Sequence, residues 1–187
     1  MKRIAVSFAV LSLCITLFAH SASETPNAND IQAIISEQFG SEFNPSPTFP
    51  VLTGDFNGDG VEDVAFVVTA KGLLHTDSSR FRVIDPSSEY FGIGDPKVTS
   101  QFASQYPGGS RYLLIIHGLG KDAWRVKEPK ERFVVINISF DRVSVGHVAK
   151  KKKKAMDDIN LEESGILSSF LYWNGHRYKW QPGATQM

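Results

Sequence analysis

The stretch TGDFNGDGVEDVAFVV, Thr53 to Val68, places three aspartates, an asparagine and three glycines directly before a valine-rich run. The glycines and the Asn/Asp residues are typical of a tight turn. The apolar run from Asp63 onward has the composition of a buried strand. The stretch therefore predicts a turn that gathers negative charge and leads at once into a core strand.

The acidic turn has the spacing of a calcium loop. Counted from Asp55, it has the pattern D-x-N-x-D-G-x-x-D, and side chains at positions 1, 3 and 5 of a tightly coiled loop point to its inside. The glycine at position 6 permits a sharp turn that brings the next carbonyl inward, and position 9 closes the site directly or through water. Calcium takes about six to eight oxygen ligands in flexible geometry. We predict one structural Ca²⁺ site with the ligands Asp55, Asn57, Asp59, Val61 and Asp63.

The motif also resembles a known family of calcium loops. An EF-hand would need glutamate at position 12, where this chain has Phe66. GDFNGDGVEDVAFVV is instead similar to the calcium-binding segment of FG-GAP and VCBS-type repeats, known from the propeller of integrin α subunits. The resemblance implies a loop between two antiparallel strands, the same five ligands, and an outward-facing Glu62. Propellers repeat this motif in several blades, whereas here it occurs once.

A metal-free surface hairpin is the alternative for this loop. In that case Asp55, Asp59 and Asp63 would repel one another, with Glu62 nearby and no cation to offset them. A bound cation converts this repulsion into a constraint on the turn. The prediction therefore favours calcium in a structural role.

The N-terminus has the pattern of a secretory signal peptide. Lys2 and Arg3 precede a short apolar run, and small residues follow between Ala19 and Ala22, where we expect cleavage. Residues 1–22 are thus predicted to be removed, and the protein to be periplasmic or secreted. The chain's single cysteine, Cys14, lies in this segment, so the mature protein would have no disulfide. Residues 23–29 are expected to be a flexible leader, and 30–187 a single domain without a membrane span.

The rest of the chain predicts one helix and several strands. Ile31, Ile34, Ile35 and Phe39 have helical spacing after Asn29, a candidate cap. Strands are expected at 63–69, 81–84, 112–117, 132–139, 142–148 and 166–173. Hairpins are expected over 132–148 and around Asn174-Gly175, a pair suited to a type I′ turn. The predicted fold class is α+β: an N-terminal helix packed on a mainly antiparallel sheet, carrying one copy of the β-hairpin calcium loop. The alternative is an all-β sandwich.

A lysine run and a group of C-terminal aromatic residues are candidate binding surfaces, but neither identifies a specific partner. Lys150, Lys151, Lys152, Lys153 and Lys154 form a run that could bind anions weakly. The run lacks interleaved aromatics and arginines, which favours a solvated loop and gives no indication of specific nucleic-acid binding. The C-terminal segment holds Tyr172, Trp173, Tyr178 and Trp180. Alternation would expose one residue of each pair, as in a glycan-binding surface, but core packing with a half-buried hairpin is the favoured alternative.

No catalytic motif stands out. The sequence has no G-x-S-x-G and no H-E-x-x-H, and Gly118-Leu119-Gly120-Lys121 only faintly resembles a phosphate loop. A hydrolase using His117 with Asp95 or Asp122 is the alternative function, although no spacing supports it. We therefore expect an exported calcium-binding protein, more a binding module than an enzyme, with a protein or cell-envelope glycan as its partner.

Overall fold

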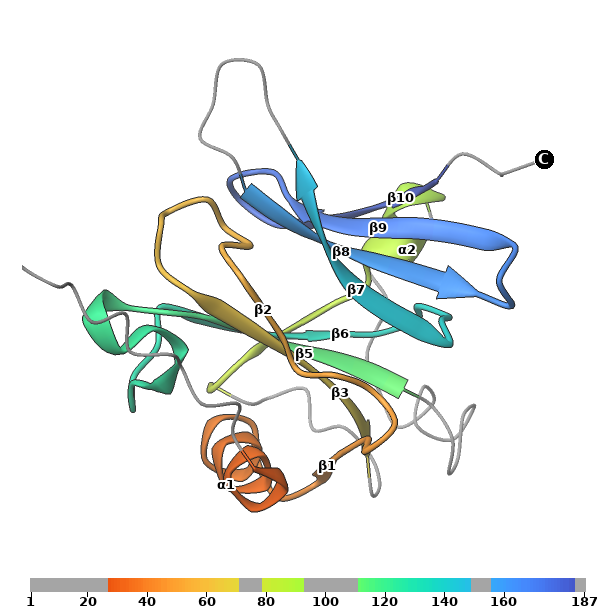
Figure 1. The fold of residues 1–187 in the computed structure, drawn as a ribbon. Helices are drawn as coiled ribbons and strands as arrows, with labels where there is room; N and C mark the ends of the chain where they lie inside the picture. The colour runs from red at the N-terminus through yellow and green to blue at the C-terminus, as the bar shows by residue number, and fades with distance from the viewer. Residues whose placement is uncertain (1–26, 71–78, 93–110, 149–155, 184–187) are drawn as a thin grey trace, which may run out of the picture.

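A computed structural model describes residues 27–70, 79–92, 111–148 and 156–183 (Figure 1). Of these residues, 45% lie in strands and 18% in helices. The strands form two sheets, which lie one above the other in Figure 1. Segments that the structure describes as helical are α1 (Ala28–Gln38), α2 (Pro86–Tyr90) and the 3₁₀ segment η1 (Gly120–Arg125).

The first sheet has six strands in the order β1-β3-β5-β6-β4, and β2 also pairs with β3. Only the pairing of β4 with β6 is parallel among these strands. The bounds are β1 (Phe43–Pro45), β2 (Leu52–Gly54), β3 (Asp63–Ala70), β4 (Arg82–Ile84), β5 (Arg111–His117) and β6 (Glu131–Val135).

The second sheet is a four-stranded antiparallel meander in the order β10-β9-β8-β7. Its strands are β7 (Arg142–Val148), β8 (Met156–Glu163), β9 (Leu167–Trp173) and β10 (Tyr178–Pro182). The inner side chains of β8 and β9, such as Ile159 and Leu171, are fully buried against the first sheet.

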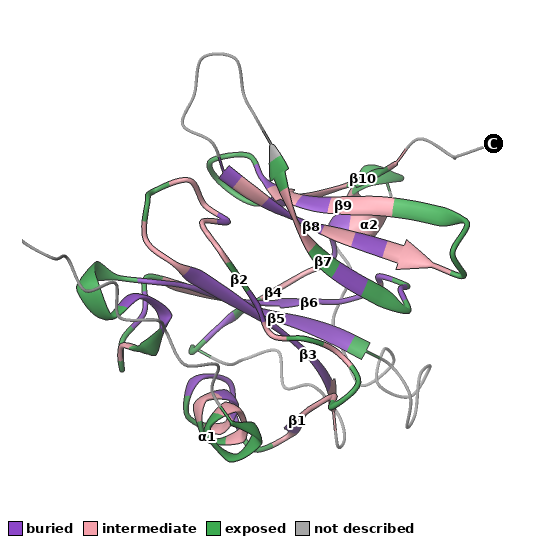
Figure 2. Ribbon diagram, in the orientation of Figure 1, coloured by how far each residue is buried: buried purple, intermediate pink, exposed green. Residues whose placement is uncertain are grey.

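Strand β3 is apolar along its length because both of its faces are covered. Ala65 and Val67 belong to the core between the two sheets. Val64, Phe66 and Val68 belong to a second core on the opposite face. Successive strand side chains point to opposite faces, so a strand buried on both sides has a continuous rather than alternating apolar pattern. Figure 2 shows this strand as buried over most of its length.

The predicted α+β fold class is wrong. The described residues are mostly strand, in two packed sheets, and α1 is the only described helix of seven residues or more. This helix is a small addition to the second core, to which it contributes Ile35, while Phe39 follows as its C-cap. Asn27, rather than Asn29, caps its start by accepting hydrogen bonds from the N–H groups of Asn29 and Asp30.

Two predicted hairpins also differ from the structure. The segment 132–148 is not a hairpin, because β6 joins the first sheet and β7 the second. Around Asn174-Gly175 the strands do pair, but Asn174 donates its N–H to the Arg177 carbonyl, which places Gly175 and His176 at the centre of the turn. Gly175 has a positive φ of 107°, whereas a type I′ turn would require positive φ at both central residues.

Candidate metal site

The acidic loop joins β2 to β3, which pair as antiparallel neighbours with Gly54 opposite Asp63. Its second residue, Phe56, is only 1% exposed and belongs to the core between the sheets. The loop is therefore anchored from within by an apolar side chain, while its acidic residues lie around the turn.

The four polar side chains of the predicted site all accept hydrogen bonds from backbone N–H groups within the loop. The pairs are Gly60 N to Asp55 Oδ2 (2.8 Å), Asp59 N to Asn57 Oδ1 (2.8 Å), Val61 N to Asp59 Oδ1 (2.9 Å) and Asn57 N to Asp63 Oδ2 (3.1 Å). This pattern turns the side-chain oxygens toward the loop's own backbone and fixes the turn.

Asp63 is the most constrained of these residues. It is 0% exposed, and its second oxygen, Oδ1, accepts a 2.8 Å hydrogen bond from the N–H of Gly118. Burial raises the pKa of Asp63 to about 7, against the lowering effect of the N–H groups of Gly118 and Asn57. The negative charges of Asp59 and Asp55 raise it further.

Lys130 lies against the loop and pairs with Asp59. Its Nζ is 2.9 Å from Asp59 Oδ2. Partial burial alone would raise the pKa of Asp59, but the hydrogen bonds from Lys130 and from the Val61 N–H lower it below its ordinary value. One of the three loop aspartates is thus compensated by a lysine from the segment that precedes β6.

Glu62 contacts a neighbouring segment of the protein, although its side chain is 40% exposed. Its Oε1 accepts hydrogen bonds from Trp124 Nε1 at 2.9 Å and from Arg125 at 3.1 Å. Trp124 is only 1% exposed, so Glu62 satisfies a buried donor of η1. Glu62 was not among the predicted ligands, and these contacts are with η1.

A second contact joins the loop to the other sheet. Asp157, on β8, accepts the N–H of Asp55 at its Oδ2 (2.8 Å), and its own N–H donates to the Asp55 carbonyl at 3.0 Å. Sequence reasoning missed Asp157, Lys130 and Gly118, which are distant in the chain. The sequence Gly118–Lys121 was noted only as a weak resemblance to a phosphate loop. In the structure the N–H of Gly118 instead donates a hydrogen bond to Asp63.

The donor set fits a hard cation by its chemistry, since it consists of three carboxylates, one amide oxygen and one backbone carbonyl. The arrangement is not that of a preformed cage: no group of three or more His, Cys, Asp or Glu side chains in the described segments is placed to hold a metal ion. A cation would have to compete with Lys130 for Asp59 and with backbone N–H groups for the other oxygens.

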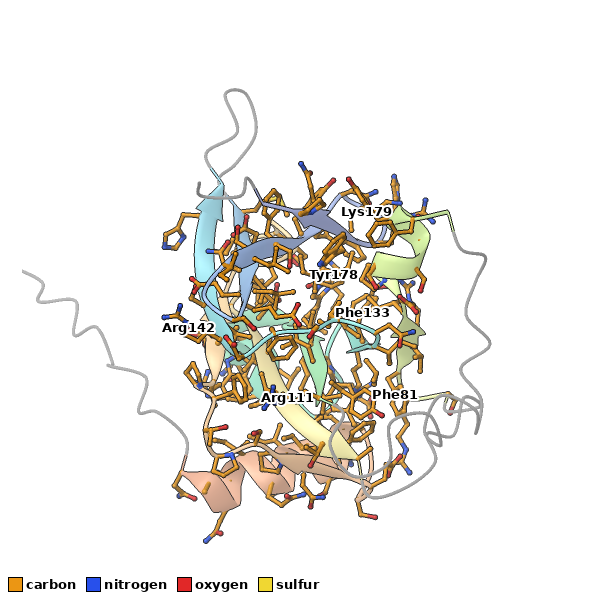
Figure 3. The ribbon with its side chains drawn as sticks, turned by 90° about the vertical axis from the view of Figure 1, so that its right-hand side faces the viewer. Phe81, Arg111, Phe133, Arg142, Tyr178 and Lys179 are labelled. Atoms are coloured by element: carbon orange, nitrogen blue, oxygen red, sulfur yellow. The ribbon has the colours of Figure 1, made fainter. Side chains whose placement is uncertain are left out.

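Of the residues considered for a hydrolase, the structure describes His117 and Asp122. His117 is 0% exposed, and its Nε2 lies 2.7 Å from the Tyr178 hydroxyl in the core between the sheets, where Figure 3 labels Tyr178 and Phe133. Burial lowers the pKa of His117 to about 4, and the positive charge of Lys130 adds to this effect. Asp122 is exposed on η1, and Asp95 lies outside the described residues.

The aromatic residues at the C-terminus are mostly internal. Trp173 and Tyr178 are buried, and Tyr172 and Trp180 are half-buried. Among the described residues, the most exposed rings are instead Tyr90 (52%) and Phe91 (66%), at the end of α2. Their ring centroids lie 5.2 and 5.7 Å from that of Trp180 on β10, and we call these three residues the aromatic cluster.

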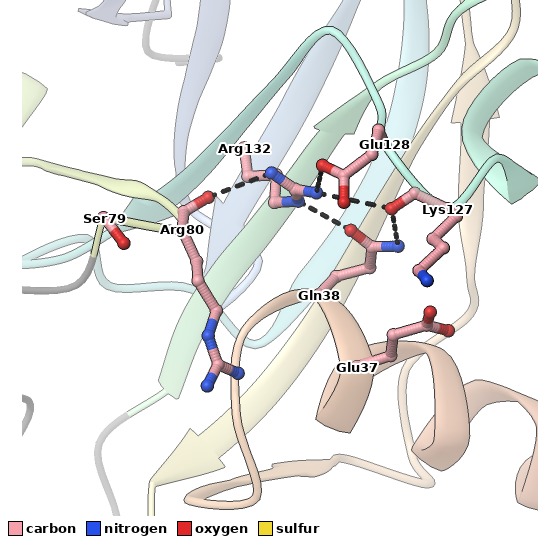
Figure 4. A pocket seen from close by; sticks show the side chains of 7 residues that line it. All are labelled: Glu37, Gln38, Ser79, Arg80, Lys127, Glu128 and Arg132. Carbon is pink, nitrogen blue, oxygen red and sulfur yellow. Dashed lines mark hydrogen bonds and ion pairs between the residues drawn. The ribbon is translucent and has the colours of Figure 1, made fainter.

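A polar cavity of about 380 Å³ lies between α1 and the segment before β6 (Figure 4). Arg132 occupies its centre, donating to Gln38 Oε1 at 2.6 Å and to the Arg80 carbonyl at 3.3 Å. Glu128 pairs with the same guanidinium at 3.2 Å. Arg132 is therefore engaged in joining α1 to the first sheet. The residues lining the cavity are polar and include charges of both signs: Glu37, Gln38, Ser79, Arg80, Lys127, Glu128 and Arg132.

Comparison with known proteins adds no relative: no protein-family model, curated protein or solved structure matches the chain. Within the described segments, no helix has both the length and the apolar character needed to cross a membrane. The predicted signal peptide and the lysine run Lys150–Lys154 lie outside the described residues.

Proposed function

We propose that this is an exported calcium-binding protein in which the loop from Asp55 to Asp63 holds one Ca²⁺ ion. The observation that carries the proposal is the presence of three carboxylates and an amide oxygen on one short turn between β2 and β3. Burial raises the pKa of Asp63, and the neighbouring negative charges of Asp59 and Asp55 raise it further, as expected for like charges on one turn. A divalent cation would offset this repulsion.

The ligands would be the side chains of Asp55, Asn57, Asp59 and Asp63 and the carbonyl of Val61, as the resemblance to FG-GAP and VCBS-type loops implies. When bound, the ion supplies charge compensation and fixes the turn between β2 and β3. Extracellular calcium sites have dissociation constants as weak as about 10⁻⁴ M, and about 1 mM calcium would then stabilise the fold by roughly 1.4 kcal/mol. This is a structural role.

Thermal unfolding tests the proposal. We expect the melting temperature to rise by about 3–6 °C in 2 mM CaCl₂ relative to excess chelator. It should rise much less in MgCl₂, because Mg²⁺ requires nearly ideal octahedral coordination. Asp55→Ala should lose the calcium-dependent shift. Glu128→Ala removes an exposed acidic residue elsewhere and should retain it. Equal melting temperatures with calcium and with chelator would contradict the proposal.

We further propose that the protein acts as a binding module for a protein or a cell-envelope glycan. The support is the aromatic cluster, because exposed Tyr and Phe rings are typical of surfaces that bind partners or stack on sugars. Co-sedimentation with purified peptidoglycan tests the glycan partner directly. Binding that is lost in Tyr90→Ser/Phe91→Ser, with melting temperature unchanged, would support the glycan; absence of binding by the wild type would exclude peptidoglycan.

A further inference from the structure

We infer that Asp157 is a positioning residue of the calcium loop, so that the second sheet helps to determine the loop's affinity for the ion. This inference rests on the proposed function. Asp157 lies at the start of β8, about a hundred residues along the chain from Asp55. It contacts the backbone of Asp55, the first predicted ligand, and does not itself belong to the predicted ligand set.

The contact fixes Asp55 from both of its backbone polar groups. The Asp55 N–H donates to Asp157 Oδ2 at 2.8 Å, and the Asp55 carbonyl accepts the Asp157 N–H at 3.0 Å. Two hydrogen bonds to one residue restrict its backbone rotation. The direction of the Asp55 side chain is therefore set by β8 as well as by the hairpin that carries it.

The sequence next to Asp55 allows this close approach. A Cβ on Gly54 would lie 2.6 Å from Asp157 Oδ2, much closer than non-bonded atoms approach. On the other side, Phe56 is buried in the core between the sheets. Where the loop leaves β2, Asp55 is therefore held between the buried Phe56 side chain and the Asp157 carboxylate.

Asp157 is itself held by a neighbour. Its Oδ1 lies 2.5 Å from Nδ1 of His147, the opposite residue on β7. The Asp157 side chain is 19% exposed, while that of His147 is 82% exposed. Outer residues that orient a metal ligand in this way commonly change metal affinity by about 10–100-fold when they are removed.

Calcium titration by isothermal calorimetry at a temperature where all variants are folded tests the inference. Asp157→Ala should raise the calcium dissociation constant by about tenfold or more, because the backbone of Asp55 must then be ordered when calcium binds. Asp157→Asn retains an acceptor for the Asp55 N–H and should restore most of the affinity. The control is Glu162→Ala, on the same strand, which removes a carboxylate that pairs with Arg142 away from the loop.

A general destabilisation would lower the melting temperature in chelator without changing the dissociation constant of the folded protein. If Asp157→Ala does not fold, Gly54→Ala displaces the same carboxylate from the other side and should weaken binding similarly. Wild-type affinity in the folded variant would overturn the role of Asp157 while leaving the proposed function intact. A wild-type protein that binds no calcium would overturn the proposed function, and this inference with it.

Discussion

The carboxylate of Asp63, at the first position of β3, accepts a 2.8 Å hydrogen bond from the backbone N–H of Gly118, just beyond the end of β5. These two strands are antiparallel neighbours. The hydrogen bond ties the acidic loop to the segment that leads into η1. Asp63 therefore has a structural role in the fold besides the ligand role proposed for it.

Gly118 should not tolerate a side chain. A Cβ at this position would overlap the Glu62 carbonyl oxygen and would lie 2.8 Å from the Ala123 carbonyl carbon and 2.9 Å from the Trp124 nitrogen, all backbone atoms. We expect Gly118→Ala to lower the free energy of unfolding by about 3 kcal/mol or more, measured by urea denaturation. Gly120→Ala is the matched control: it has open space but a φ of +66°, so it should cost only about 1 kcal/mol. Equal effects of the two substitutions would contradict this account.

Removing Lys130 should strengthen calcium binding. Lys130→Gln frees Asp59 Oδ2 from its ion pair, so calcium no longer competes with a resident cation. A partly exposed pair of this kind contributes less than about 1 kcal/mol, so calorimetry should show up to about fivefold tighter binding. Lys121→Gln removes the same charge from an exposed residue of η1 and should have little effect. Weaker binding by Lys130→Gln would show that Lys130 supports the site.

Glu62 should stabilise the fold through η1. In Glu62→Ala the buried indole N–H of Trp124 loses its acceptor, which should cost about 1–3 kcal/mol. Urea denaturation followed by tryptophan fluorescence measures this loss. Glu62→Gln keeps an acceptor oxygen and should recover most of it. If Ala and Gln are equally destabilising, the charge of Glu62, through Arg125, matters more than the hydrogen bond to Trp124.

The buried His117 should make stability depend on pH. Its folded pKa of about 4 lies below its ordinary value of 6.5, so between these values the unfolded chain binds a proton that the folded protein resists. The free energy of unfolding is therefore unaffected by His117 protonation above pH 6.5. It falls by about 3 kcal/mol as pH falls toward 4. The raised pKa of Asp63 has the opposite effect, lowering the free energy of unfolding as pH rises from 4 to 7. The test therefore compares a His117 variant with the wild type, because Asp63 is common to both.

As pH falls from 7 to 4.5, we expect the free energy of unfolding of His117→Gln to increase relative to that of the wild type. Denaturant unfolding in chelator at several pH values measures it. His176→Gln, in the exposed β9–β10 turn, is the control and should follow the wild type. A difference that does not change with pH would show that His117 is not responsible.

Local features were predictable where one segment determines them. The strand predicted at 142–148 has those bounds in the structure, and β3 runs one residue beyond the predicted 63–69. Short, valine-rich runs bounded by turn residues are typical of such strands. The turn from Asp55 to Asp63 was likewise visible from its Asp, Asn and Gly spacing.

Long-range pairing was not predictable in the same way. Strands β6 and β7 are separated by only a few residues, yet Val135 pairs with Leu113 of β5 and Arg142 with Glu162 of β8. Neither choice is encoded in the segment between them, and this is why the predicted hairpin and fold class were wrong. For the same reason the contacts of Asp157 and Lys130 with the loop could not be deduced from the motif.

The most direct test of the central claim is calcium titration of the chelator-treated protein by isothermal calorimetry, alongside Asp59→Ala and Glu128→Ala. The account predicts one ion bound per chain with a dissociation constant on the order of 10⁻⁴ M. Binding should be lost in Asp59→Ala and unchanged in Glu128→Ala. No saturable binding by the wild type, or equal binding by the Asp59→Ala variant, would contradict it.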